Sequence, residues 1–135
     1  MPDFRTVTET FSVAPQITPE DIAEAARRGF VKVINNRPDG EAPDQPPGAV
    51  MAAAARAAGL DYAHIPVLGM PSGDLIEAMT DAVEAADGPV LAFCRSGTRS
   101  ITIWSLGQAQ TGARSRQELI GLGAAAGYDL SGALG

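Results

Sequence analysis

The sequence has little cysteine, histidine and positive charge. Its 135 residues include one cysteine, Cys94, and one histidine, His64. These cannot form an internal disulfide, and they leave too few soft ligands for a structural metal site. Ten lysines and arginines against sixteen acids give a formal charge of −6, whereas a surface that follows nucleic acid needs a basic face. We therefore expect no metal, no cofactor and no nucleic-acid partner.

Long apolar runs are also missing. The N-terminus lacks a basic segment followed by an apolar run, and the longest apolar stretches are short and rich in alanine and glycine. Neither a targeting segment nor a membrane span is therefore expected. The sequence predicts a cytoplasmic protein without a membrane partner, in which a lone thiol stays reduced. The length suits one domain over residues 1–135.

Helix start signals alternate with short apolar runs along the chain. Thr18 precedes Pro19 at one such start, and a capping-box pattern opens at Ser115. Helices are expected over residues 18–29, 49–58, 72–86, 101–109 and 115–127, and strands over 31–34, 62–67 and 90–93. This alternation predicts an α/β fold with a short, mostly parallel central sheet flanked by helices.

A six-residue loop follows the most uniformly apolar run of the chain. Residues 90–93 suit a central strand buried on both faces, and residues 94–99 read Cys-Arg-Ser-Gly-Thr-Arg. Ligands of open α/β sheets bind at the carboxyl ends of the strands. The backbone N–H groups of such a loop, and the dipole of the helix that starts near Ser100, attract an anion. Both effects favour a reactive thiolate at Cys94.

The residues of this loop receive specific roles. Cys94 is predicted to be the nucleophile, and Arg99 is predicted to hold the oxyanion part of the substrate. The remaining candidates for substrate binding are Arg95, Ser96, Gly97, Thr98 and Ser100. A buried structural cysteine is the alternative interpretation of Cys94. A solvated surface arginine is the alternative interpretation of Arg95.

The loop resembles the active-site loop of single-domain rhodaneses, whose thiolate carries sulfur as a persulfide. The rest of the chain resembles the bacterial family called the beta-lactamase-hydrolase-like phosphatase-like domain, also described as sulfurtransferases. The segments that carry this second resemblance are residues 11–18, 33–38, 64–67 and 88–94. Nearly the whole chain is covered. The resemblance implies the fold of dual-specificity phosphatases and a catalytic cysteine.

The chain departs from the tyrosine and dual-specificity phosphatases in two ways. Those enzymes hold five residues between the catalytic cysteine and arginine, whereas four separate Cys94 from Arg99, so a tighter loop is expected. They also take a general-acid aspartate from the loop that corresponds to residues 68–71, which contain no acid. Asp74 is the nearest acid, and we interpret it as a first-turn residue of the helix after Ser72.

These departures favour sulfur transfer through a persulfide on Cys94. Sulfite leaves a sulfur donor without a proton, whereas the leaving group of a phosphate ester needs a proton donor. A phosphatase-like hydrolase of phosphate esters is the first alternative. A non-catalytic oxyanion-binding or redox-sensing domain is the second. The expected partners are a small-molecule sulfur donor or a phosphate ester, with an oxyanion such as phosphate or sulfate in the loop.

Three further features receive structural interpretations. Arg37 and Asp39 are interpreted as part of a solvated turn, although both would lie near the loop if the strands are parallel. His64 is interpreted as a packed or hydrogen-bonded histidine. The proline-rich stretch of residues 36–48 is either functional or mobile.

Overall fold

The computed structural model describes residues 2–135. The elements follow in the order β1 (Arg5–Thr6), β2 (Phe11–Ala14), α1 (Pro19–Arg27), β3 (Lys32–Asn35), α2 (Gly48–Ala57), β4 (Asp61–His64), α3 (Gly73–Glu84), β5 (Val90–Phe93), α4 (Thr98–Gln110) and α5 (Arg116–Ala125). The strands form one sheet in the order β1-β2-β5-β3-β4, in which β1 pairs antiparallel and the others parallel. The predicted α/β fold with a mostly parallel sheet is confirmed.

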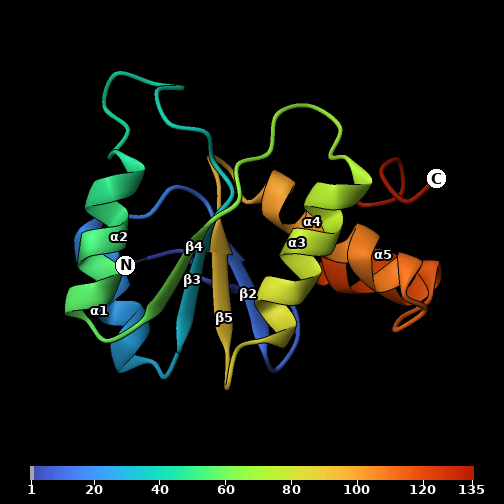
Figure 1. Cartoon of the computed structure of the whole chain (residues 1–135). Helices are drawn as coiled ribbons and strands as arrows, with labels where there is room; N and C mark the ends of the chain where they lie inside the picture. Colours follow the sequence, from blue (N-terminus) through green and yellow to red (C-terminus); the bar gives the residue numbers. More distant parts are fainter. Residues whose placement is uncertain (1) are drawn as a thin grey trace.

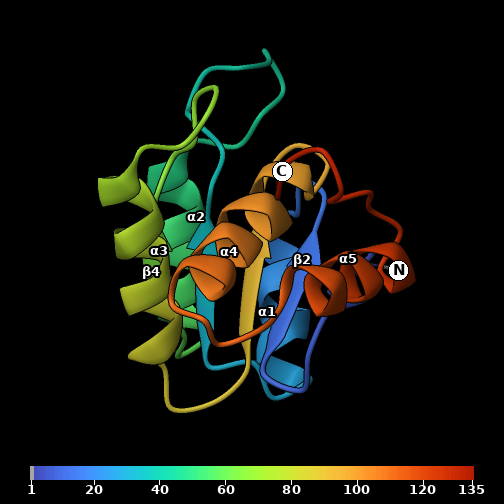
Figure 2. The same cartoon turned by 90° about the vertical axis from the view of Figure 1, so that its right-hand side faces the viewer.

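Helices cover both faces of the sheet. In Figure 1, α1 and α2 lie on one side, and α3, α4 and α5 lie on the other. Figure 2 looks at the second face, where α4 crosses in front of β5. Within β5, Val90 and Ala92 join the core beneath α3, α4 and α5, while Leu91 and Phe93 join the core beneath α1 and α2. The strand is therefore buried on both faces, as its sequence predicts.

The helix caps follow the sequence closely. Thr18 Oγ1 accepts the N–H of Asp21 at 3.1 Å, and the Asp21 carboxylate accepts the N–H of Thr18 at 3.0 Å, which completes a capping box. At Ser115 only half of the expected box forms. Ser115 Oγ accepts the N–H of Glu118 at 3.1 Å. The Glu118 carboxylate instead accepts from Arg114 at 2.8 Å, because that guanidinium lies within reach.

Two strands and one helix start differ from the sequence prediction. The sequence predicts neither β1 nor β2. Every residue of β2 is buried beside β5, so this strand has no polar alternation, and four residues are too few for a periodic signal. Helix α4 begins at Thr98, three residues before the predicted start. Gly97 turns the chain into the helix with a φ of 91°.

The parallel register brings four chain segments to one edge of the sheet. Phe93 of β5 is level with Ala14 of β2 and with Asn35 of β3, and Asn35 is level with His64 of β4. The chain therefore leaves all four strands at the same edge, which lies at the top of Figure 1. Among residues 2–135, no helix is long and apolar enough to cross a membrane.

Candidate active site

Cys94 is the first residue after β5, and its side chain is completely buried. Its Sγ accepts a hydrogen bond from the N–H of Gly97 at 3.1 Å. Gly97 is the N-cap of α4, so the sulfur lies at the N-terminal end of this helix. The unpaired N–H groups and the dipole of a helix N-terminus stabilise an anion. The sulfur therefore lies where an oxyanion group of a substrate can also be held.

Tyr128 supports this loop from the other end of the chain. Its hydroxyl donates to the carbonyl oxygen of Ser96 at 2.8 Å. The Arg5 guanidinium lies 5.0 Å from the centre of the Tyr128 ring, on its face. Burial raises the pKa of Tyr128, so the hydroxyl stays protonated and remains a donor. Sequence reasoning missed Tyr128, because a lone aromatic residue after the last helix carries no periodic signal.

Replacing Gly97 by alanine is expected to destabilise the fold more than replacing Gly59 by alanine. Both glycines have positive φ, so both substitutions strain the backbone. A Cβ at Gly59 would meet open space, whereas one at Gly97 would overlap the hydroxyl of Tyr128. The overlap should lower the free energy of unfolding by an additional amount of about 1–3 kcal/mol. Urea denaturation of the two variants measures the difference, and equal losses would contradict the contact with Tyr128.

Arg99 lies in the first turn of α4 and is held by two neighbours. Its Nη1 and Nη2 each donate to one oxygen of the Glu41 carboxylate at 2.8 Å. Nη1 also donates to the carbonyl oxygen of Val67 at 3.0 Å. The hydrogen bonds to Glu41 raise the pKa of Arg99, and the sulfur of Cys94 is close enough to raise it further. Arg99 is therefore tied to the segments that follow β3 and β4.

Glu41 also accepts a hydrogen bond from a second arginine, Arg37. Its Oε1 accepts from Nε of Arg37 at 2.9 Å, and Nη1 of Arg37 donates to Oε1 of Gln16 at 3.0 Å. Hydrogen bonds from Arg99, and to a smaller extent from Arg37, lower the pKa of Glu41 from 4.5 to about 2. Burial of the carboxylate acts in the opposite direction but does not outweigh them. Glu41 is thus ionised at neutral pH. Sequence reasoning missed both Glu41 and Gln16.

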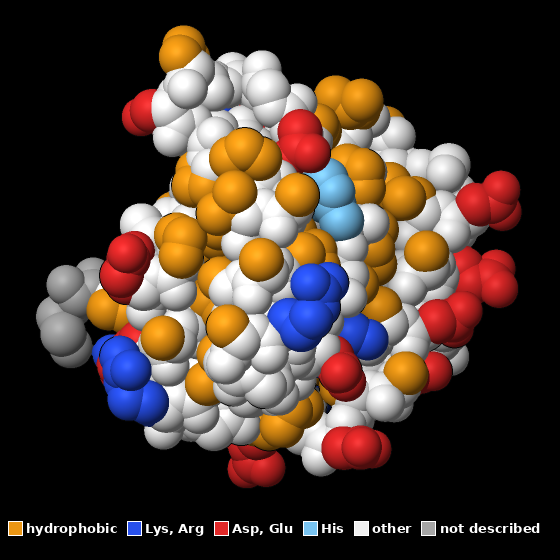
Figure 3. All heavy atoms as spheres, turned by 60° about the vertical axis from the view of Figure 1, so that its left-hand side comes forward, with side chains coloured by type: hydrophobic (Ala, Val, Ile, Leu, Met, Phe, Trp, Pro, Cys, Tyr) orange, Lys and Arg blue, Asp and Glu red, His pale blue; other side chains and the backbone are white. Residues whose placement is uncertain are grey.

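The interpretation of Arg37 as part of a solvated turn is wrong. Its side chain is only 5% exposed, because it packs at the sheet edge between Gln16 and Glu41. Asp39 accepts the N–H of Gly48 at 2.8 Å. His64 is hydrogen-bonded through Nε2 to the carbonyl oxygen of Arg37 at 2.8 Å, in agreement with its interpretation. Its ring is the pale-blue side chain at the surface in Figure 3.

The remaining predicted loop residues have different environments. The hydroxyls of Ser96 and Thr98 bond to each other at 2.9 Å on the exposed side of the loop. Arg95 is exposed, and within residues 2–135 its side chain makes no hydrogen bond, while its carbonyl oxygen accepts from Gln16 at 3.2 Å. Ser100 Oγ is fully buried and has no hydrogen-bond partner in the described part of the chain. A buried hydroxyl of this kind is available to a bound group.

Among residues 2–135, no protonated carboxylic acid is hydrogen-bonded to the cysteine loop. In the range 2–135, Glu41 is the one carboxylate that is hydrogen-bonded to a residue of the loop 94–99, and it is ionised. Asp74 is exposed in the first turn of α3, where it complements the helix dipole as interpreted. The site can therefore bind an oxyanion and supply a nucleophile. It lacks an evident general acid.

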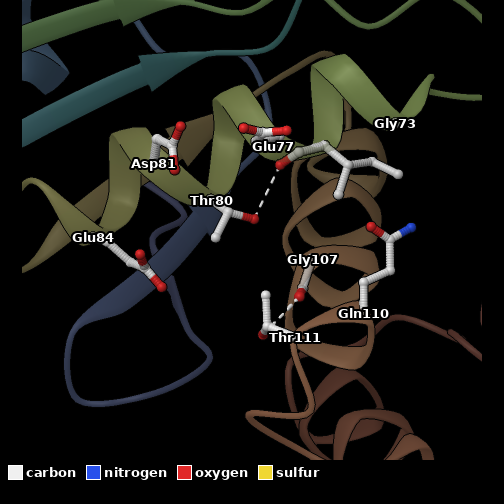
Figure 4. Close-up of a pocket in the computed structure, with 9 residues that line it drawn as sticks. Gly73, Glu77, Thr80, Asp81, Glu84, Gly107, Gln110 and Thr111 are labelled. Atoms are coloured by element: carbon white, nitrogen blue, oxygen red, sulfur yellow. Dashed lines mark hydrogen bonds between the residues drawn. The ribbon is translucent and has the colours of Figure 1, made fainter.

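A separate groove of about 400 Å³ lies between α3 and α4. Figure 4 shows its lining, which includes Glu77, Asp81 and Glu84. No residue of the cysteine loop contributes to it. Three carboxylates would repel a phosphate or sulfate, so this groove is not the oxyanion site.

Comparison with known proteins identifies the family of this chain. The family model of the beta-lactamase hydrolase-like protein, phosphatase-like domain, matches residues 3–111. The chain belongs to this family. A beta-lactamase hydrolase-like protein of Xylella fastidiosa is 38% identical over 129 residues, which are 95% of this chain and 30% of that protein. The chain thus spans less than a third of the length of the curated relatives that it matches.

Solved structures agree with this membership. A protein from Neisseria meningitidis Z2491, provisionally named a phosphatase, has 30% identity and a TM-score of 0.86 over 98% of this chain and 94% of that one. The P. aeruginosa protein TpbA, solved with phosphotyrosine as a cysteine-to-serine variant, shares the fold with a TM-score of 0.64 and 14% identity. That pair covers 98% of this chain and 75% of TpbA. The predicted family and its phosphatase-like fold are confirmed.

The comparisons bear differently on the two predicted chemistries. The family and the structural relatives are phosphatase-like, which supports the alternative of phosphate-ester hydrolysis. They do not support the sulfurtransferase prediction or a relation to rhodaneses. The roles assigned to Cys94, Arg99 and the other loop residues stay predictions.

Proposed function

We propose that this protein hydrolyses phosphate monoesters through Cys94. One observation carries the proposal. The buried Cys94 sulfur lies at the N-terminus of α4 with Arg99 beside it, in a phosphatase-like fold. In the first step the thiolate attacks phosphorus while the bond from phosphorus to the ester oxygen breaks, and that oxygen leaves with the electron pair. Water then attacks the phosphocysteine, which releases inorganic phosphate and restores the thiolate.

The lack of a proton donor for the leaving oxygen restricts which phosphate esters can react. An alkoxide is a poor leaving group without a general acid, whereas a phenolate leaves more easily. Glu41 cannot supply the proton, because its pKa of about 2 keeps it ionised. We therefore propose aryl rather than alkyl phosphates as substrates, and the phosphotyrosine in the TpbA structure is an ester of this kind.

Sulfur transfer is the second candidate, and the four-residue spacing between Cys94 and Arg99 favours it. A shorter loop leaves less room for a phosphoryl transition state, and a site too small for that state cannot be improved by tighter ground-state binding. The Cys94 thiolate would attack the outer sulfur of thiosulfate, and sulfite would leave with the electron pair. The resulting persulfide would be discharged by cyanide as thiocyanate.

Intact mass spectrometry distinguishes these candidates. The protein is incubated separately with p-nitrophenyl phosphate and with thiosulfate, then acid-quenched, with Cys94→Ser as the control. The proposed function predicts steady phosphate release and a phosphorylated species that is absent from the control. An added sulfur atom on Cys94 without phosphate release would contradict phosphate-ester hydrolysis and would support sulfur transfer. If neither a covalent adduct nor phosphate release is detected, the domain binds oxyanions without catalysing a reaction.

A further inference from the structure

The geometry points to Glu41 as a positioning residue for Arg99, with Arg37 as the anchor that holds Glu41 in place. This inference rests on the proposed function. It adds to that function a residue from a different loop, because Glu41 follows β3 whereas Arg99 follows β5. Glu41 would not touch the substrate. It would act by fixing the direction in which the guanidinium of Arg99 points.

The donors of Arg99 support this role. Nη1 donates two hydrogen bonds, one to Glu41 and one to the carbonyl oxygen of Val67. Nη2 donates one hydrogen bond to Glu41. A guanidinium has five N–H groups in a fixed planar fork. The N–H of Nε and the second N–H of Nη2 therefore remain on another edge. That edge can hold two oxygens of an oxyanion bidentately while Glu41 keeps its own two hydrogen bonds.

Glu41 is itself well fixed. The nearly buried Arg37 guanidinium donates to it at 2.9 Å. Its backbone N–H donates to Gln45 Oε1 at 3.0 Å, and Nε2 of Gln45 donates to the carbonyl oxygen of Pro38 at 2.9 Å. These contacts order the segment 36–47 at the carboxyl edge of the sheet, which Figure 1 shows above β3. A held guanidinium loses less rotamer freedom when a substrate binds.

The charges lead to the same conclusion. Arg37 and Arg99 both donate to Oε1 of Glu41, so one carboxylate lies between two guanidinium groups. Without its negative charge the two cations would repel, and Arg99 would turn away from the fixed direction. The opposite model treats Glu41 as an internal anion that competes with the substrate for Arg99. The two models predict opposite changes in oxyanion affinity.

The test compares Glu41→Gln, Glu41→Asp and Glu118→Gln. Glu118 accepts from Arg114 at 2.8 Å in an exposed ion pair, so its variant is a matched control away from the loop. Sulfate binding is measured by calorimetry in the Cys94→Ser background. Glu41→Gln should raise the Kd for sulfate about tenfold, because a misdirected guanidinium loses a bidentate contact. Glu41→Asp should give a smaller increase, and Glu118→Gln should give none.

Turnover provides a second readout. With Cys94 present, Glu41→Gln should lower kcat for p-nitrophenyl phosphate about 10- to 100-fold with a smaller change in KM. A purely structural role would instead reduce the fraction of folded protein, which thermal melting measures. If Glu41→Gln fails to fold, Glu41→Asp decides by the same two readouts. Tighter or unchanged sulfate binding in the folded variants would overturn the inference. Sulfate binding needs no turnover, so failure of the proposed hydrolysis is distinguishable from failure of this inference.

Discussion

Replacing Cys94 by serine is expected to abolish turnover of p-nitrophenyl phosphate, with a loss of at least about 10⁴-fold. A serine hydroxyl is not ionised at neutral pH, and the carboxylate of Glu41 is already occupied by Arg37 and Arg99. Sulfate binding should be retained or tightened, since serine keeps an acceptor for the N–H of Gly97 and carries no negative charge that would repel the anion. Steady-state kinetics and calorimetry measure the two quantities.

Alkylation provides an independent check of the same residue. Iodoacetamide should alkylate wild-type Cys94 in the native protein, and added sulfate should slow the reaction, because the sulfur lies beside the proposed oxyanion site at the start of α4. A serine variant that retained turnover would exclude Cys94 as the nucleophile. No alkylation of the native protein would indicate a buried structural cysteine.

The second large effect concerns the two arginines of the loop. Arg99→Lys is expected to lower kcat/KM for p-nitrophenyl phosphate by a factor of about 30 to 1,000, equivalent to about 2–4 kcal/mol. An ammonium group cannot grip two oxyanion oxygens while also reaching Glu41 and Val67. Arg95→Lys should change kcat/KM by less than about threefold, because Arg95 is exposed.

Steady-state kinetics of the two lysine variants check this prediction, with thermal melting as the control for folding. A larger loss for Arg95→Lys would show that the oxyanion is held on the exposed side of the loop. The roles of the two arginines would then have to be exchanged. Equal and small losses would indicate that the backbone N–H groups of the loop bind the oxyanion without either side chain.

The central part of the fold and the loop could be predicted because their signals are local. An apolar run followed directly by Cys94 and a Gly-containing loop indicates a buried strand that ends at a site. The parallel order of β2, β5 and β3 then places neighbouring strand ends beside the sulfur. The interval from Cys94 to Arg99 is likewise visible in sequence, so both residues could be chosen without a structure.

The partners of Arg99 could not be predicted because they are brought together by the sheet. Glu41 is 58 positions from Arg99 in the chain and lies in a segment without periodicity. The sequence favours a solvated Arg37 because the proline and glycine that follow it favour a turn. Its burial depends on Gln16, which follows a strand that the sequence does not predict. Contacts between different strand exits require the topology first.

The contact between Tyr128 and the cysteine loop bears on how the domain can be divided. The family model ends at residue 111, yet the residue that supports the carbonyl oxygen of Ser96 lies beyond that point. Leu119 and Leu130 of the same C-terminal part are buried in the main core. A fragment that ends at residue 111 would therefore expose an apolar face, and the cysteine loop would lose its hydrogen bond from Tyr128. The region that the family model matches is therefore shorter than the unit that must be expressed to keep the site intact.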